Sequence, residues 1–247
     1  AVEGKDSKFI GKDAHELAGC SKKGIKISND LINAAKHSEA FIDFSSIEST
    51  LHASEISAQA RIVHVIGTTG FSIEQEEIIK AAARHATVIK SGNMSLGINI
   101  LLGVVQNITK LVDDNWAIEI SEIHHKEKKD HPSGTALALG ASVAKGKKID
   151  LEENKVIDDP IIDAVDINLT KIRKNVVRKK DDIGFSSYRK DGVIGDHSVI
   201  FSSENERIAL THIAKNRNIF ANGALKAALW GQNKKPGLYS MQDVLGF

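Results

Sequence analysis

The chain has 247 residues, 41% of them hydrophobic and 26% charged, so it is expected to form one large domain or two smaller ones. The net charge of +1 gives no global field to attract nucleic acid or a membrane, and no apolar run approaches the roughly 18 residues of a membrane span. The single cysteine, Cys20, excludes a disulfide framework and a cysteine-based zinc site. No signal peptide is recognised, and because the chain starts without methionine, its true N-terminus is expected to lie before Ala1.

The first part of the chain alternates between strand and helix patterns. Short apolar runs at residues 40–44, 61–67 and 86–90 each end in glycine or polar residues, and helical patterns at 46–60 and 72–85 lie between them. Ser72 and Gln75 have the spacing of a capping box, which marks the start of the second helix. Strands alternating with helices predict a parallel sheet with crossover connections.

The second part of the chain combines helical and strand patterns in a different order. An amphipathic helix is predicted at 97–113, a strand at 116–121 and a helix rich in small residues at 136–144, followed by loops and short elements over 146–182. Beyond these, a period of two predicts a hairpin meander with strands at 183–188, 193–202 and 207–214. Asp191-Gly192 has the composition of a two-residue hairpin turn. A last helix is predicted at 221–230. The sequence therefore predicts an α/β fold, with a dinucleotide-type half up to about residue 95, an α+β half after it, and a C-terminus that returns to the first half.

Three polar loops follow the predicted parallel strands. They are Asp43-Phe44-Ser45, the Gly67-Thr68-Thr69-Gly70 loop, and Ser91-Gly92-Asn93-Met94. In open parallel sheets ligands bind beyond the carboxyl ends of the strands, so together these loops predict a ligand site, although each alone has the composition of an ordinary βα turn. Glu3 is a candidate for the acid that binds the ribose hydroxyls in a dinucleotide fold. The alternative is that Glu3 is an ordinary surface acid. No G-x-G-x-x-G motif is present.

A cationic loop joins the strand at 116–121 to the helix at 136–144. It contains His124, His125 and Lys128, and its lysines favour proton transfer to an anionic ligand. Adjacent residues of an extended chain point to opposite faces, so a zinc site would need His131 and an acid at poor spacing, and a simple solvated basic loop is the other alternative. Pro132-Ser133-Gly134-Thr135 then predicts a helix N-terminus with free N–H groups, where carboxylate or phosphate binds.

The segment Glu-x-His-His-x-x-Lys-x-Asp-x-Pro-Ser-Gly-Thr-Ala, from Glu122 to Ala136, closely resembles the signature of the 4-hydroxy-tetrahydrodipicolinate reductase family. The segment Ile66-Gly-Thr-Thr-Gly-Phe71 resembles the family's second cofactor loop. The segments Phe220-Ala-Asn-Gly-Ala224 and Ala-Leu-Trp230 resemble its C-terminal helix. The resemblance extends over essentially the whole chain. It implies a Rossmann-like parallel-sheet cofactor domain (residues 1–95), an α+β substrate-binding and tetramerisation domain (96–218) and a C-terminal segment (219–247) that returns to the first.

The resemblance also implies an activity and a set of site residues. The family reduces a cyclic imine dicarboxylate with NADPH or NADH, in lysine and diaminopimelate biosynthesis. By position, His124 matches the acid/base and Lys128 the proton donor, and His125, Ser133, Gly134 and Thr135 fall where the substrate binds. The matching cofactor contacts are Glu3, Gly67, Thr68, Thr69, Ser91, Gly92, Asn93 and Met94.

The same resemblance implies a homotetramer joined through the C-terminal sheet. A cytoplasmic protein is expected, and charge, composition and residue spacing predict no bound metal and no nucleic-acid or membrane partner. The family's first glycine loop is not found in this sequence, and Gly4 stands where many relatives carry an arginine for the 2′-phosphate. Lys5 offers a point charge that could take the place of this arginine, so the choice between NADPH and NADH stays open.

Two other functions remain as alternatives. Another amino-acid dehydrogenase of the same two-part plan would not need to combine His-His-x-x-Lys with Ser-Gly-Thr. A basic loop that binds nucleic acid or a phosphorylated partner would be accompanied by stacking aromatic residues, but aromatic residues make up only 5% of the chain and none lies in this loop.

Overall fold

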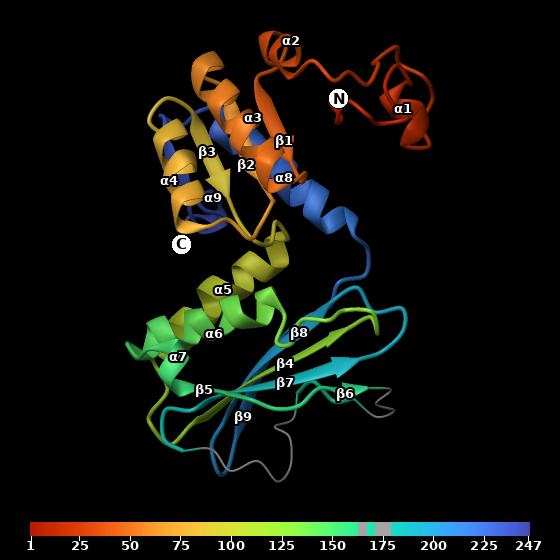
Figure 1. The fold of residues 1–247 in the computed structure, drawn as a ribbon. Helices are drawn as coiled ribbons and strands as arrows, with labels where there is room; N and C mark the ends of the chain where they lie inside the picture. The colour runs from red at the N-terminus through yellow and green to blue at the C-terminus, as the bar shows by residue number, and fades with distance from the viewer. Residues whose placement is uncertain (163–166, 171–178) are drawn as a thin grey trace. The chain divides into compact units, whose positions relative to one another are not determined.

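The computed structural model describes residues 1–162, 167–170 and 179–247. These residues divide into two compact units, Ala1–Ser91 with Ala224–Val244, and Gly92–Gly223 with Leu245–Phe247. Figure 1 shows the path of the chain through both units. Among the described residues, no helix combines the length and apolarity that crossing a bilayer requires.

The first unit contains a four-stranded parallel sheet in the order β1-β2-β3-β10. Its strands are β1 (Ala40–Asp43), β2 (Val63–Ile66), β3 (Thr87–Lys90) and β10 (Gly237–Tyr239). Its helices are α1 (Ala14–Leu17), α2 (Leu31–Lys36), α3 (Ile47–Ala60) and α4 (Ile73–Ala82). The end of the chain adds most of α9 (Met241–Leu245) and the part of α8 (Asn218–Gly231) that starts at Ala224. The predicted parallel sheet is confirmed, and β10 is a strand that the sequence pattern did not predict.

Helices cover both faces of this sheet, as Figure 1 shows. On one face Ile79 of α4 packs with Ile66 and Val88. On the other, Gly231 of α8 lies so close to the sheet that a Cβ there would be 2.8 Å from Val63 Cγ1. The predicted capping box is present: the Ser72 hydroxyl accepts from the Gln75 N–H, and the Gln75 side chain accepts from the Ser72 N–H at 2.8 Å. This helix–sheet–helix arrangement is the Rossmann-like architecture that the sequence predicted.

The second unit is built on a mixed six-stranded sheet in the order β5-β7-β4-β8-β9, with β6 also paired to β7. The strands are β4 (Ala117–His124), β5 (Lys155–Ile157), β6 (Ile161–Ile162), β7 (Ile183–Arg189), β8 (Asp196–Ser202) and β9 (Arg207–His212). Its helices are α5 (Leu96–Thr109), α6 (Gly134–Lys147) and α7 (Leu151–Asn154). The long α5 and α6 lie side by side along the sheet (Figure 1), and at Gly146 their backbones approach so closely that a Cβ would be 2.9 Å from the Gln106 carbonyl oxygen.

The predicted hairpin between residues 183–188 and 193–202 is wrong. β7 pairs with β4 in parallel and β8 pairs with β4 antiparallel, so β4 lies between the two strands that were expected to be neighbours. Asp191-Gly192 therefore belongs to a longer connection that passes over the end of β4, not to a two-residue turn. A local turn pattern cannot reveal that an earlier strand, buried along nearly its whole length, has inserted between two later ones. The expected pairing of 193–202 with 207–214 is confirmed as β8 and β9.

One face of this sheet changes from apolar to polar along the strands. Alternation places Ile118 and Ile120 of β4 on the face that packs against α5 and α6, together with Phe185 of β7 and Phe201 of β8. Glu122 and His124 continue the same face toward the end of β4. The apolar core therefore ends where a group of charged side chains begins.

Candidate active site

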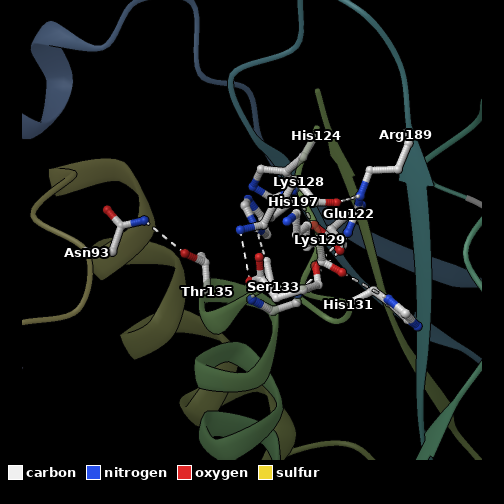
Figure 2. Close-up of polar contacts among 12 residues, drawn as sticks. Asn93, Glu122, His124, Lys128, Lys129, His131, Ser133, Thr135, Arg189 and His197 are labelled. Atoms are coloured by element: carbon white, nitrogen blue, oxygen red, sulfur yellow. Dashed lines mark hydrogen bonds and ion pairs between the residues drawn. The ribbon is translucent and has the colours of Figure 1, made fainter. Parts of the chain in front are cut away.

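Strand register brings the polar side chains at the end of β4 together with those of its two neighbours. Glu122 pairs with Ser187 of β7 on one side and with His197 of β8 on the other. His124, two residues further along, pairs with Arg189. All five positions face the same side of the sheet by alternation, so residues more than 60 positions apart in the chain form one cluster. Figure 2 shows this cluster at close range.

Glu122 is the centre of the cluster and is only 1% exposed. Its Oε1 accepts from Arg189 Nη1 at 3.2 Å and from the Ser133 N–H at 3.3 Å, and its Oε2 lies against Nδ1 of His124. Burial alone would raise the pKa of the Glu122 carboxyl, but His124, Ser187 and Arg189 outweigh burial and lower that pKa to about 2. Glu122 is therefore a carboxylate at any ordinary pH.

His197 lies beside His124, with ring centroids 5.0 Å apart and planes at 77°. Its Nε2 is 3.1 Å from the Ser133 hydroxyl. Burial lowers the pKa of His197 to about 3, and the charges of His124, His212 and Lys128 add to the effect while Glu122 opposes it. His197 is therefore a neutral imidazole that contributes shape and hydrogen bonding to the cluster, not charge.

Arg189 ties the cluster to the cationic loop. Besides Glu122, its guanidinium donates to the carbonyl of Lys128 from Nε at 3.2 Å and to the carbonyl of Asp130 from Nη2 at 2.7 Å. The Lys128 ammonium in turn pairs with the Asp130 carboxylate at 2.9 Å, where the lysine side chain is 21% exposed. One buried arginine thus fixes both the carboxylate beside His124 and the backbone that carries Lys128.

The helix N-terminus expected after Pro132 is confirmed. Ser133 is the N-cap of α6, and its hydroxyl accepts from the Ala136 N–H at 3.1 Å. Gly134 is exposed, and a Cβ at this position would meet no atom within 4 Å. Thr135 accepts from the Asn93 side-chain amide at 3.0 Å, as Figure 2 shows. The start of α6 therefore offers open space next to N–H groups and a cationic loop, which suits an anion.

The two histidines of the His-His pair differ in burial, as expected for adjacent residues near the end of a strand. His124 is the last residue of β4 and is 8% exposed, whereas His125 begins the loop and is partly exposed. This difference in burial agrees with side chains that point to opposite sides of an extended chain. His131 is exposed and is not part of the cluster.

Ligand atoms of Glu122, His124 and His197 lie within 4.8 Å of one another, a separation that could also suit a metal ion. Three contacts argue for a hydrogen-bonded cluster instead. Arg189 neutralises the Glu122 carboxylate, Ser133 engages Nε2 of His197, and the Glu122–His124 contact is a direct one. A divalent cation placed there would also face Arg189 and Lys128. These side chains therefore contact one another and their neighbours directly.

Several members of this cluster could not be assigned from the sequence. Glu122 stood inside the recognised motif without a role, and Arg189 and His197 come from strands expected to form a hairpin elsewhere. The i, i+2 spacing of Glu122 and His124 was an available signal that both would share one face of a strand. No local signal indicated that β7 and β8 would flank β4.

In the first unit, the predicted loops lie beyond the carboxyl ends of β1, β2 and β3, which end in register at Asp43, Ile66 and Lys90. The Gly67 N–H donates to the Asp43 carbonyl at 2.8 Å, and the Phe44 ring lies over Gly67 so closely that a Cβ there would be 2.2 Å from the ring. Thr68 is buried and accepts from the Thr50 hydroxyl at 2.9 Å, while Thr69 is exposed. Glycine backbone and an exposed hydroxyl at this sheet edge fit a nucleotide.

The other predicted cofactor residues have varied surroundings. Glu3 is exposed, and its N–H donates to the Ser28 carbonyl at 2.9 Å. Ser91 donates its N–H to the Ile66 carbonyl at 3.1 Å, and Gly92 is exposed. Met94 is only 1% exposed, so its side chain is buried.

Comparison with known families accounts for nearly all of the chain. Residues 1–94 match the family model described as dihydrodipicolinate reductase, N-terminus, and residues 97–245 match its C-terminal counterpart. A protein named 4-hydroxy-tetrahydrodipicolinate reductase from Parvibaculum lavamentivorans is 50% identical over 99% of this chain and 86% of its own length. The protein of the same name from Rhizobium rhizogenes is 49% identical over 100% of this chain and 86% of its own length.

Solved structures agree on the fold. A dipicolinate-bound dihydrodipicolinate reductase from Paenisporosarcina superposes with a TM-score of 0.71 at 19% identity, over 98% of this chain and 88% of that one. An amine dehydrogenase from Mycobacterium smegmatis superposes with a TM-score of 0.61 at 10% identity, over 95% and 85% of the two chains.

Proposed function

Because the chain belongs to the dihydrodipicolinate reductase family, we propose that it carries out that family's reaction with His124 and Lys128 as its proton-transfer groups. The chain is an oxidoreductase that uses a nicotinamide nucleotide to reduce 4-hydroxy-tetrahydrodipicolinate to tetrahydrodipicolinate, in lysine and diaminopimelate biosynthesis. The observation that supports the residue roles most strongly is that Glu122, which lies against His124, also accepts from the Ser133 N–H at the start of α6.

The reaction replaces a ring hydroxyl by hydrogen, so a hydride and a proton are taken up and water leaves. The nicotinamide nucleotide supplies the hydride when it is bound. The protein must hold the substrate's two carboxylates, exclude competing water and deliver the proton. These tasks belong to the side chains and backbone of the second unit in our proposal.

For the carboxylates, we assign the exposed first turn of α6, with Gly134 and Thr135, and the adjacent His125. The helix dipole and free N–H groups attract negative charge there, and the loop lysines add to the positive potential. The Ser133 hydroxyl already contacts the Ala136 N–H and His197, so its part in substrate binding would be to hold the helix end in place. A relative in the same family holds dipicolinate, a planar ring with two carboxylates, which supports this choice of ligand.

For the proton, we assign Lys128 and His124, which Arg189 links. Arg189 binds Glu122, which lies against His124, and it also donates to the Lys128 carbonyl. Lys128 carries its proton on an ammonium held by Asp130, and His124 presents an imidazole at the end of β4. Proton transfer from a positioned side chain contributes roughly 10²- to 10⁴-fold to a rate. The two residues therefore account for the part of the reaction that the hydride donor does not supply.

For the cofactor, we assign the carboxyl edge of the first sheet, with Gly67, Thr68 and Thr69 and the turn Ser91-Gly92-Asn93-Met94, and Glu3 for the ribose hydroxyls. Met94 would take part through its backbone, because its side chain is buried. Either NADPH or NADH is compatible with Glu3 followed by Gly4 and Lys5, since Lys5 offers a point charge but not the bidentate geometry of arginine. We further propose a cytoplasmic homotetramer formed through the second sheet, whose edge strand β9 exposes Ile208.

A direct assay tests the function. Oxidation of NADPH or NADH is followed at saturating, freshly prepared imine, with the natural full-length protein. His124→Ala and Lys128→Ala should each lower turnover by about 10² or more, as lost proton transfer would. Lys129→Ala is the matched control, because it removes an exposed charge from the same loop and should leave turnover nearly unchanged. Wild-type turnover in both alanine variants would remove these side chains from the mechanism.

The carboxylate site has its own test. Dipicolinate should inhibit competitively against the imine, and Thr135→Val should weaken that inhibition because it removes the hydroxyl beside the helix N-terminus while keeping the volume. Unaltered inhibition in the valine variant would show that the dicarboxylate binds elsewhere.

A further inference from the structure

Glu122 is a buried carboxylate without an assigned role. It lies at 1% exposure on a strand, and each of its oxygens faces a different neighbour: Oε1 faces Arg189 and the Ser133 N–H, and Oε2 faces Nδ1 of His124. A buried carboxylate is costly to keep unless it is paired, and pairing with Arg189 alone would satisfy its charge. The second contact, with the imidazole, is therefore the part that calls for an explanation.

We propose that Glu122 is a positioning residue: it accepts the Nδ1–H of His124, fixes the imidazole in one tautomer and leaves Nε2 as the atom that exchanges a proton with the substrate. This inference rests on the proposed role of His124. An imidazole nitrogen that donates to a carboxylate keeps its proton there, and the other nitrogen then carries the lone pair or the exchangeable proton. In the reaction the Nε2 proton leaves to the substrate, the imidazolium becomes neutral with its remaining proton still on Nδ1, and Glu122 stays ionised throughout.

The surroundings of Nε2 fit this assignment. Gly195, the residue immediately before β8, has a φ of 156°, and a Cβ at that position would lie 2.7 Å from His124 Nε2. The absence of a side chain at Gly195 therefore keeps room beside Nε2, whereas Nδ1 is turned toward the buried carboxylate. One nitrogen of the ring faces the protein interior and the other faces space that a side chain would fill.

Charged and titratable groups from the neighbouring strands surround the pair formed by Glu122 and His124. Arg189 of β7 holds Glu122, the neutral His197 of β8 lies against the His124 ring, and His212 of β9 and Lys128 of the loop lie further out. Because Arg189 also binds the backbone of Lys128 and Asp130, it keeps the imidazole and the lysine of the loop in a fixed relation. The positioning therefore extends to both proposed proton-transfer groups.

The first experiment needs no variant. The ¹⁵N shifts of the His124 ring are measured by long-range NMR correlation in the full-length protein, and assigned by comparison with His124→Gln. At a pH where the ring is neutral, the proton is expected on Nδ1. A neutral ring with its proton on Nε2 would overturn the proposal whatever the turnover of any variant.

The second experiment uses Glu122→Gln, with Glu119→Gln as the matched control. Glu119 is a fully buried carboxylate of the same strand on the opposite face, where it accepts from the Ser186 hydroxyl at 2.5 Å. Glu122→Gln should lower kcat by about 10-fold or more, change the KM for the imine less than about threefold and shift the tautomer of His124, because the amide can donate to Nδ1 as well as accept from it. Glu119→Gln should keep the wild-type kcat and the wild-type tautomer.

The outcomes separate two failures. Equal loss of kcat in both glutamine variants, or an unchanged tautomer in Glu122→Gln, would show that the carboxylate acts only through the fold and would overturn the positioning role. Wild-type turnover in His124→Ala would instead overturn the proposed function of His124, while the ring spectra would still report whether Glu122 fixes the tautomer.

Discussion

Mild acid should destabilise this protein through His197, at pH values where its carboxylates are still ionised. The side chain is 3% exposed, and burial lowers its pKa from the ordinary 6.5 to about 3. Between these two pKa values His197 is protonated in the unfolded chain but neutral in the native state. The contribution of His197 to the free energy of unfolding is therefore fully present above about pH 6.5 and is lost as the pH falls toward about 3.

The size of the effect follows from the two pKa values of His197. Each pH unit inside this window costs about 1.4 kcal/mol, so acidification from about pH 7.5 to about pH 5 should remove about 2 kcal/mol of unfolding free energy through this one residue. His124, His212 and Lys128 hold the native pKa down, and Glu122 opposes them. Because burial is the largest cause, the loss should persist in moderate salt.

The assay is urea unfolding at both pH values and one protein concentration, followed by tryptophan fluorescence. His197→Gln keeps an amide near the position of Nε2 for the Ser133 hydroxyl but cannot titrate, so it should lose about 2 kcal/mol less than the wild type over the same pH interval. His85→Gln, at an exposed histidine, is the control and should follow the wild type. If the wild type and His197→Gln lose equal stability on acidification, the argument from burial is wrong.

Three further predictions concern the scaffold. Ser72→Ala removes the N-cap hydroxyl of α4 and should cost about 1 kcal/mol in thermal or urea unfolding, whereas Ser72→Asp should restore most of it; an unchanged midpoint in the alanine variant would contradict the capping role. Gly140→Ala places a Cβ 2.4 Å from Phe185 Cζ, between α6 and β7, and should destabilise by about 1–3 kcal/mol, while Gly134→Ala at the open start of the same helix should not clash. The pKa of Asp43 falls from 3.8 to about 2 because hydrogen bonds from His64, Ser45 and Thr50 outweigh burial. The contribution of Asp43 to the free energy of unfolding is therefore present above about pH 4 and lost as the pH falls through about 2. In Asp43→Asn the free energy of unfolding should depend less on pH in that window than in the wild type.

The parts of the fold that the sequence predicted are those where local pattern and final structure agree. The runs ending at Asp43, Ile66 and Lys90 form parallel strands because each is short and apolar, and because the helices α3 and α4 connect one to the next. The capping box at Ser72 and the N-cap at Ser133 depend on residues three apart. Such features need no knowledge of distant partners.

The parts that could not be predicted depend on long-range pairing. The tripeptide Gly237–Tyr239 becomes a strand only because the edge of β3 is available to it. The segment around Asp191-Gly192 has the composition of a tight turn, yet the pairing of both flanking strands with β4 decides its shape. Parts of the weakly patterned stretch 146–182 lie outside the described residues, at 163–166 and 171–178.

The candidate site combines both kinds of feature. His124, Lys128 and Thr135 come from one contiguous motif, so their proposed roles could be suggested from the motif and the family that it resembles. The groups that fix their geometry come from β7 and β8, and only the insertion of β4 between these strands brings Arg189 and His197 to Glu122. A proton donor is useful only when its orientation and charge state are controlled. Since that control comes from residues far away in the chain, a substitution at Arg189 should affect the chemistry of the loop while the motif itself stays intact.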